Sequence, residues 1–185
     1  PMEIVHRDIS PQNVIVSYEG DVKVVDFGIA RAALRSSKTR SGVIKGKFYY
    51  MAPEQARGEK VDHRCDIFTA GILLYELLTT RPCYDEEDKG ILLEKVKNAD
   101  FLRPEPFRAG LSPQLVKILD KAMTVDPNDR YQTAEDLAWD LTRFLKAAGL
   151  HPTRLHVQKY LRRLFFQDRE EGAVEEQGEL EAIIQ

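Results

Sequence analysis

The stretch HRDISPQN at residues 6–13 decides how the rest of the chain is interpreted. Two β-branched runs follow it, Val14–Val16 and Val22–Val25, and the turn-forming segment Tyr18–Asp21 lies between them. This pattern predicts a β-hairpin. The tripeptide DFG at 26–28 comes directly after the second run. The hairpin therefore brings the polar residues before it and the carboxylate after it to one end of the two strands.

Composition indicates a single soluble globular domain, because 43% of the 185 residues are hydrophobic and 31% are charged. A formal net charge of -3 does not favour a nucleic-acid partner. The longest apolar stretch, residues 67–78, is shorter than the about 20 residues of a membrane span and contains Glu76. Cys65 and Cys83 give neither a disulfide framework nor metal-ligand spacing. With no signal-peptide pattern, these features predict a cytoplasmic protein.

Beyond the hairpin, a loop and then several helices are expected. Residues 29–52 contain six Lys or Arg and no Asp or Glu, which predicts a long basic loop. Residues 70–78 are apolar nearly all round, as in a helix buried in a core. Further helices are predicted after the capping residues Ser112 and Thr133, and over residues 152–167.

Three more motifs follow in order: APE at 52–54, DIFTAG at 66–71 and DPNDRY at 126–131. Together with HRDISPQN and DFG, they resemble the catalytic half of the protein kinase family, in particular its bacterial serine/threonine kinases. The resemblance covers about residues 4 to 146. It implies a mainly α (α+β) fold: the large C-terminal lobe, with a small β-hairpin carrying the catalytic loop and the magnesium-binding motif.

The resemblance also implies a reaction, the ATP-dependent phosphorylation of Ser or Thr hydroxyls on a protein substrate. Asp8 matches the catalytic base that orients the acceptor hydroxyl, and Asn13 and Asp26 match the ligands of the Mg²⁺ that accompanies ATP. Oxygen ligands suit this hard cation, which keeps waters and phosphate oxygens in its shell. The competing interpretation is that Asp8 and Asn13 only cap a turn. The family's serine/threonine members also share Pro11 and the pair Tyr50-Met51.

Other matching residues are expected to hold the site without doing chemistry. Glu54 and Arg130 match a buried ion pair that fixes the end of the activation segment to the helical core. Asp66 matches the residue that braces the catalytic loop through backbone N–H groups. The structural members of the two catalytic motifs are His6, Phe27 and Gly28.

Two departures from the family pattern look coupled. Serine/threonine kinases usually have Lys where this chain has Ser10, and Thr where it has Lys47. We expect Lys47 to reach back and supply the positive charge near the γ-phosphate, with Ser10 as the hydrogen-bond partner, because a lysine stem is long and flexible. The alternative is that Lys47 points to solvent.

Regulation by phosphorylation of the basic loop is also implied. Arg7 resembles the arginine that receives an activation-loop phosphate, and such a phosphate orders a basic loop. Thr39 and Ser41 are the favoured acceptors. The alternative is that both are ordinary polar loop residues.

The family's Gly-rich loop, its ATP-binding lysine and its hinge would all precede His6, so the sequence contains the C-terminal lobe only. We expect ATP to bind if an N-terminal lobe is supplied, and weakly or not at all otherwise. The chain is then either a fragment of an active kinase or a non-catalytic scaffold module. A phosphohydrolase using Asp8 and Asp26 as metal ligands explains neither APE nor Arg130.

Three segments are expected along the chain. Residues 1–147 form the kinase C-lobe, residues 148–167 an amphipathic helix, and residues 168–185 an acidic, disordered tail with seven acidic residues and one basic residue. The apolar side of the helix is expected to dock on its own domain. The alternative is that it binds a partner or a membrane surface.

Overall fold

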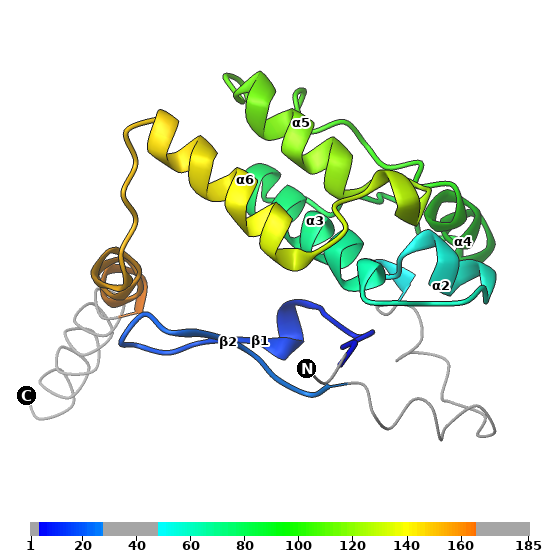
Figure 1. Cartoon of the computed structure of the whole chain (residues 1–185), viewed down its shortest axis with the longest axis horizontal. Helices are drawn as coiled ribbons and strands as arrows, with labels where there is room; N and C mark the ends of the chain where they lie inside the picture. Colours follow the sequence, from blue (N-terminus) through cyan, green and yellow to red (C-terminus); the bar gives the residue numbers. More distant parts are fainter. Residues whose placement is uncertain (1–3, 28–47, 166–185) are drawn as a thin grey trace, which may run out of the picture. The chain divides into compact units, whose positions relative to one another are not determined.

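The computed structural model describes residues 4–27 and 48–165 (Figure 1). These residues belong to two compact units. The first comprises Pro1–Val14 and Val24–Gly149, and we call it the helical unit. The second comprises Ile15–Lys23 and Leu150–Gln185, and we call it the hairpin-tip unit. The strands of one hairpin pass from one unit into the other.

The predicted hairpin is present. A short 3-10 helix η1 (Pro11–Asn13) leads into strand β1 (Val14–Val16), which pairs with β2 (Val22–Val24) in a two-stranded sheet. In the turn, Ser17 N–H donates to the carbonyl of Asp21 at 2.8 Å, and Gly20 N–H donates to the carbonyl of Ser17 at 2.9 Å. The turn requires a left-handed residue, and glycine supplies it at Gly20 with φ of 85°.

The helical unit is built from helices, as the sequence predicted. In order they are α2 (Pro53–Arg57), α3 (Arg64–Thr79), α4 (Lys89–Lys97), α5 (Pro113–Ala122), the short η3 (Pro127–Asp129) and α6 (Ala134–Ala147). Local capping explains where two of them begin. Ser112 accepts from the N–H of Gln114 at the start of α5, and Thr133 and Asp136 form a reciprocal capping box at the start of α6.

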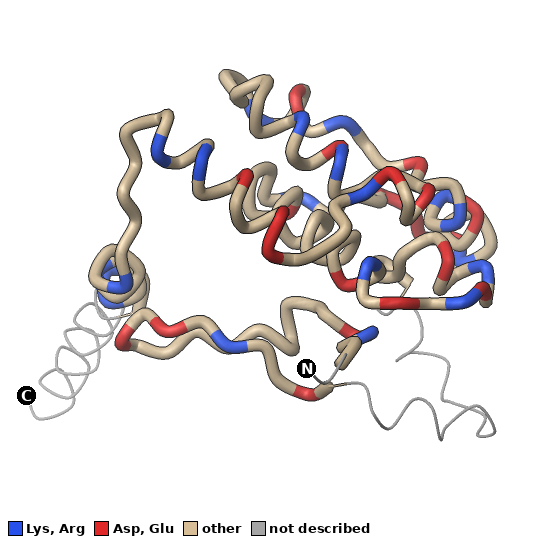
Figure 2. Tube along the Cα trace, in the orientation of Figure 1, with Lys and Arg blue, Asp and Glu red and all other residues tan. Residues whose placement is uncertain are grey.

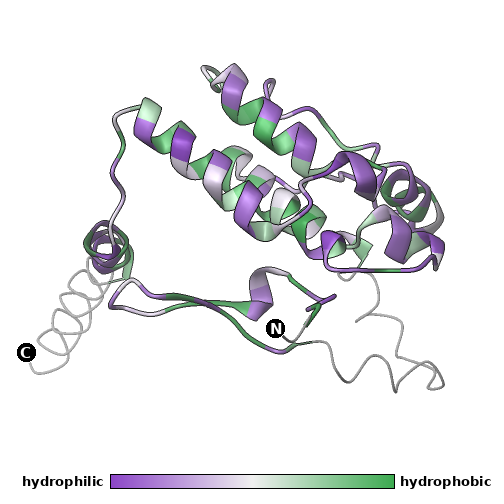
Figure 3. Ribbon diagram, viewed as in Figure 1, coloured by the Kyte–Doolittle hydropathy of each residue, from purple (hydrophilic) through white to green (hydrophobic). Residues whose placement is uncertain are grey.

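Helix α3 lies at the centre of this unit and packs against α5 and α6 (Figure 1). One core cluster gathers side chains of α3, α4 and α5, including Phe68, Leu92 and Leu119. A second joins α3, α5 and α6 through residues such as Ile67 and Leu137. Figure 3 shows apolar stretches along α3 where these helices face one another. The helix begins at Arg64, before the predicted apolar run, so its polar first turn was missed.

The charge and the length of the described helices bear on which partners they could have. Basic and acidic residues are mixed along the helices of the helical unit (Figure 2). Among the residues described, no helix combines the length and the apolar character needed to cross a membrane. Cys65 and Cys83 are both buried free thiols.

Candidate functional site

The histidine of HRDISPQN links the catalytic-loop segment to the end of β2. His6 is 4% exposed, and its Nε2 lies 2.9 Å from the carbonyl oxygen of Val25. Its Nδ1 accepts from the backbone N–H of Asp8 at 3.3 Å. The two contacts together fit a neutral imidazole that carries its proton on Nε2. The ring also lies 4.9 Å from that of Phe27, centroid to centroid.

Asn13 forms hydrogen bonds to Asp8 on one side and to Val25 on the other. Its side-chain Nδ2 donates to the carbonyl of Asp8 at 2.7 Å, and its own carbonyl accepts from the N–H of Val25 at 2.9 Å. Val25 directly precedes Asp26. The backbone of Asp8, the side chain of Asn13 and the residue before Asp26 therefore meet at the open end of the hairpin.

The side-chain oxygens of Asn13 and Asp26 are few, which suits Mg²⁺ better than a metal ion whose ligands all come from the protein. Asn13 bonds Asp8 through its Nδ2, and its amide oxygen has no hydrogen bond to another described residue. The carboxylate of Asp26, which is exposed, also has no hydrogen bond or ion pair within residues 4–27 and 48–165. No group of three or more His, Cys, Asp or Glu in those ranges is arranged to hold a metal. One amide and one carboxylate suit a cation completed by water and phosphate oxygens.

Two residues of the site have left-handed backbones without being glycine. Arg7 has φ of 64° and Asp26 has φ of 58°. Such conformations cost on the order of 1–3 kcal/mol each and persist only where the surroundings fix them. The neighbouring hydrogen bonds supply that constraint, and strained residues of this kind gather at functional sites.

Two side chains attach the Arg7 backbone to the helices. Asp66, in the first turn of α3, accepts from the N–H of His6 at 2.7 Å and from the N–H of Arg7 at 2.8 Å, one at each carboxylate oxygen. This is the contact that the family resemblance implied for Asp66. Gln55 of α2 donates to the carbonyl of Arg7 at 3.0 Å while its Oε1 accepts from the N–H of Ala52 at 2.9 Å.

Gln55 is not part of any motif that the sequence offers for the site. Its position three residues after Ala52, at the start of a helix, indicates a side chain that returns to the helix N-terminus. Nothing in that local pattern indicates the second bond, to a residue 48 positions earlier in the chain.

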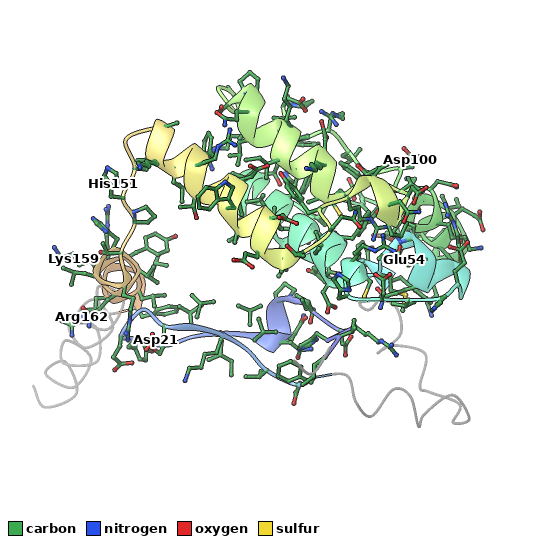
Figure 4. All side chains as sticks on the ribbon, viewed as in Figure 1. Asp21, Glu54, Asp100, His151, Lys159 and Arg162 are labelled. Atoms are coloured by element: carbon green, nitrogen blue, oxygen red, sulfur yellow. The ribbon has the colours of Figure 1, made fainter. Side chains whose placement is uncertain are left out.

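Glu54 and Arg130 form the ion pair that the resemblance implied. The guanidinium donates to both carboxylate oxygens, at 2.8 and 2.7 Å, and the two side chains are 4% and 0% exposed. Its remaining N–H groups donate to the carbonyls of Thr124, Val125 and Arg64. All five guanidinium donors are thereby satisfied, so the buried charge is fully compensated. Figure 4 shows Glu54 at the packed end of the helical unit where α2 and α4 meet.

A second polar pair, also missed, holds the segment before APE on α3. The hydroxyl of Tyr50 donates to both carboxylate oxygens of Glu76, at 3.1 Å each, and Thr69 donates to the carbonyl of Tyr50 at 3.0 Å. Burial raises the pKa of Glu76 above its ordinary value. Burial, and then the neighbouring Glu76 charge, raises the pKa of Tyr50.

Several predicted site residues lie outside the described residues, namely Gly28, Thr39, Ser41 and Lys47. The expected exchange between Ser10 and Lys47 therefore remains a prediction. Ser10 itself is half-buried, and its carbonyl accepts from the N–H of Asn13 at 2.9 Å. Arg7 is exposed. Because Thr39 and Ser41 lie outside the described residues, its expected role as a phosphate receptor also remains a prediction.

The chain is similar to known protein kinases over most of its length. The family model for the protein kinase domain matches residues 1–140, a range that contains every contact described above for the site. Tyrosine-protein kinase MasK of Myxococcus xanthus is 51% identical over 146 residues, which are 78% of this chain and 22% of that protein.

Two further relatives carry serine/threonine kinase names. Probable serine/threonine-protein kinase PknB of Corynebacterium glutamicum is 39% identical over 161 residues, 84% of this chain and 25% of that protein. Serine/threonine-protein kinase PknB of Mycolicibacterium smegmatis is 39% identical over 142 residues, 76% of this chain and 23% of that protein. The chain thus spans about a quarter of the length of the curated relatives that it matches.

Proposed function

Since the chain belongs to the protein kinase family, we propose that it is the part of an ATP-dependent protein kinase that orients the acceptor hydroxyl and holds the catalytic Mg²⁺. The observation that carries this proposal is the hydrogen-bond chain from Asp8 through Asn13 to Val25. It joins the backbone carbonyl of Asp8, the side chain of Asn13 and the N–H of Val25, the residue before Asp26, and so supports a site that these three polar residues share. Phosphoryl transfer depends chiefly on such positioning and on charge compensation.

Each residue has a distinct role in this proposal. Asp8 accepts or orients the proton of the substrate hydroxyl as that oxygen approaches the γ-phosphate. Asn13 and Asp26 would hold Mg²⁺ through their side-chain oxygens, and the bound cation neutralises phosphate charge. Asp66, which is hydrogen-bonded to the catalytic-loop backbone, positions that loop and takes no part in the chemistry.

The acceptor is proposed to be serine or threonine on a protein. Pro11 and the Tyr50-Met51 pair support this class, as do the names of the two PknB relatives. The name of MasK, a tyrosine-protein kinase, points to the other class. Phosphoamino-acid analysis of the labelled product distinguishes them. Phosphotyrosine as the only product would overturn the acceptor assignment and leave the kinase assignment intact.

The test of the function itself is transfer from radiolabelled ATP to a protein substrate by the longest product that the gene encodes. We expect Asp8→Asn to lower kcat by about 10²- to 10⁴-fold, the usual contribution of a positioned base. Asp129→Asn is the matched control, because Asp129 is an exposed aspartate of η3. Equal activity of Asp8→Asn and wild type would refute the role of Asp8. Absence of transfer by the wild type would favour the scaffold interpretation.

A further inference from the structure

A helix beyond the family match contacts the turn of the hairpin. Residues 154–165 are helical and lie outside residues 1–140, the range that the kinase family model matches. The helix follows Pro152, and at its start Nδ1 of His156 lies 3.1 Å from the N–H and 2.9 Å from the hydroxyl of Thr153. The helix therefore has a defined beginning of its own.

Two residues of this helix contact the hairpin turn. At the first helical residue, Arg154 forms an ion pair with the carboxylate of Asp21. Further along the helix, the ring of Phe165 meets that of Tyr18 edge to face, with centroids 6.3 Å apart and planes at 89°. Lys159 and Arg162 of the same helix are exposed (labelled in Figure 4). The helix thus presents one side to the turn and another to solvent.

The turn is shaped to receive the helix at one glycine. Gly20 is buried, and a Cβ built on it would clash with the backbone carbonyl of Arg154. Its φ of 85° is left-handed as well. Gly110 shares the left-handed backbone, with φ of 78°, but a Cβ there would meet nothing within 4 Å. A side chain is therefore excluded at Gly20 for a second reason, the close approach of the helix.

The other end of the same hairpin carries the proposed metal ligands. Asn13 directly precedes β1, Asp26 follows β2 after one residue, and the bond from Val25 N–H to the carbonyl of Asn13 closes the ladder there. An isolated two-stranded hairpin is marginally stable in water, and packing against a helix is one way to stabilise it. Within the described residues the strands are mostly exposed, and helix 154–165 packs against the turn between them.

We propose that helix 154–165 is a brace on the hairpin turn, and that Gly20 and Arg154 are positioning residues for the Mg²⁺-binding end of the hairpin. The brace limits opening of the hairpin and so holds Asn13 and Asp26 at a fixed separation. The coupling to Mg²⁺ rests on the proposed function, whereas the docking of the helix on the turn does not.

Hydrogen exchange measured by mass spectrometry on residues 1–185 tests the docking. We expect Gly20→Ala to speed exchange at least about fivefold both in the turn, residues 17–21, and in the helix, residues 154–165. Gly110→Ala is the matched control, because it imposes the same left-handed strain without the clash. Strain in the turn alone would leave the helix unchanged. Unaltered exchange of residues 154–165 in Gly20→Ala would therefore overturn the proposal.

A charge exchange tests the ion pair by rescue. Asp21→Arg and Arg154→Asp each place like charges together, and each is expected to speed exchange of the helix about two- to fivefold, the scale of an exposed pair. The double variant restores opposite charges and is expected to return exchange toward the wild-type rate. Failure of the double variant to recover would exclude this pair as part of the brace.

The coupling is read from the Mg²⁺ concentration that gives half-maximal phosphoryl transfer by the longest gene product. We expect Gly20→Ala to raise this concentration severalfold and Gly110→Ala to leave it unchanged. A docked helix with an unchanged Mg²⁺ requirement would overturn the positioning role. A wild type without kinase activity would refute the proposed function instead, and the exchange results would stand apart from it.

Discussion

At the scale of single residues, the most constrained side chain of the described structure is Arg130. Its five donors bond two carboxylate oxygens of Glu54 and three backbone carbonyls, and its guanidinium carbon lies 4.8 Å from the ring centroid of Phe68. A buried pair of this kind is weak evidence for net stability, because two charges have lost their hydration. It is strong evidence for the cost of removing one partner, which leaves the other charge buried alone.

Arg130→Ala is accordingly expected to lower the free energy of unfolding by about 3–5 kcal/mol, measured by urea denaturation of residues 1–185. Arg103→Ala is the control. Its ion pairs with Asp120 and Glu105 leave its side chain 50% exposed, so a loss below about 1 kcal/mol is expected. Comparable losses in the two variants would show that Glu54 finds other partners when Arg130 is removed.

At the scale of elements, the segment that precedes α2 is held on α3 by Tyr50 and Glu76. The native pKa of Glu76 is raised by burial, so the folded chain binds this proton more tightly than the unfolded chain. Between the ordinary glutamate pKa and the raised value, the free energy of unfolding therefore falls as pH rises. The Tyr50–Glu76 pair therefore holds the segment before α2 on α3 while lowering the free energy of unfolding at neutral pH.

Glu76→Gln tests that sign. Glutamine keeps an oxygen that accepts from Tyr50 and carries no charge to desolvate, so the variant is expected to be more stable than wild type at neutral pH. Its stability is also expected to depend less on pH in urea titrations from about pH 4 to 8. Glu87→Gln, at an exposed position of the loop after α3, serves as the control. A destabilised Glu76→Gln protein would show that the ionised carboxylate is needed for the bond.

Elements were predictable from the sequence where their causes are local. Helices α5 and α6 begin where Ser112 and Thr133 cap them, and the hairpin follows from its β-branched runs and the glycine between them. The beginning of α3 was not predictable in this way. Its first turn contains Asp66, whose carboxylate bonds backbone N–H groups of residues 6 and 7, about 60 positions away.

The site was predictable to the extent that its residues stand in ordered motifs. The hairpin explains why Asn13 bonds both Asp8 and Val25, and the shared site of Asp8, Asn13 and Asp26 stays a prediction. The roles of Gln55 and of the Tyr50–Glu76 pair could not be predicted, because each depends on a contact between segments that no short sequence pattern connects. A helix over residues 152–167 was predicted, and residues 154–165 are helical. Its apolar stripe did not indicate which part of the chain it contacts.

At the scale of the whole molecule, the two compact units differ in how well they bury apolar side chains. The helical unit has two buried clusters, whereas the hairpin-tip unit leaves Tyr160 62% and Phe165 52% exposed. Regions with few buried apolar contacts open at lower free energy than the core. The two units are therefore unequal in stability.

Hydrogen exchange at increasing urea concentration is expected to separate them. Amides of residues 154–165 should lose protection first, and those of α3 only with global unfolding. The same experiment on Arg130→Ala should bring the α3 transition to lower urea and leave that of residues 154–165 in place. Simultaneous loss of protection in both regions would show that the chain unfolds as one cooperative body.

The backbone of Asp26 places an unusual restriction on what evolution or mutagenesis can do at that position. With φ of 58°, the residue belongs to a conformation that Gly, Asn and Asp adopt most easily. Glycine keeps the path of the chain and removes the proposed metal ligand, and asparagine keeps an oxygen and removes the charge. Glutamate keeps the charge, but it lacks the preference of aspartate for this backbone conformation, and its longer side chain moves the carboxylate. Aspartate therefore combines a preference for the backbone conformation with the charge that the proposed metal ligand needs.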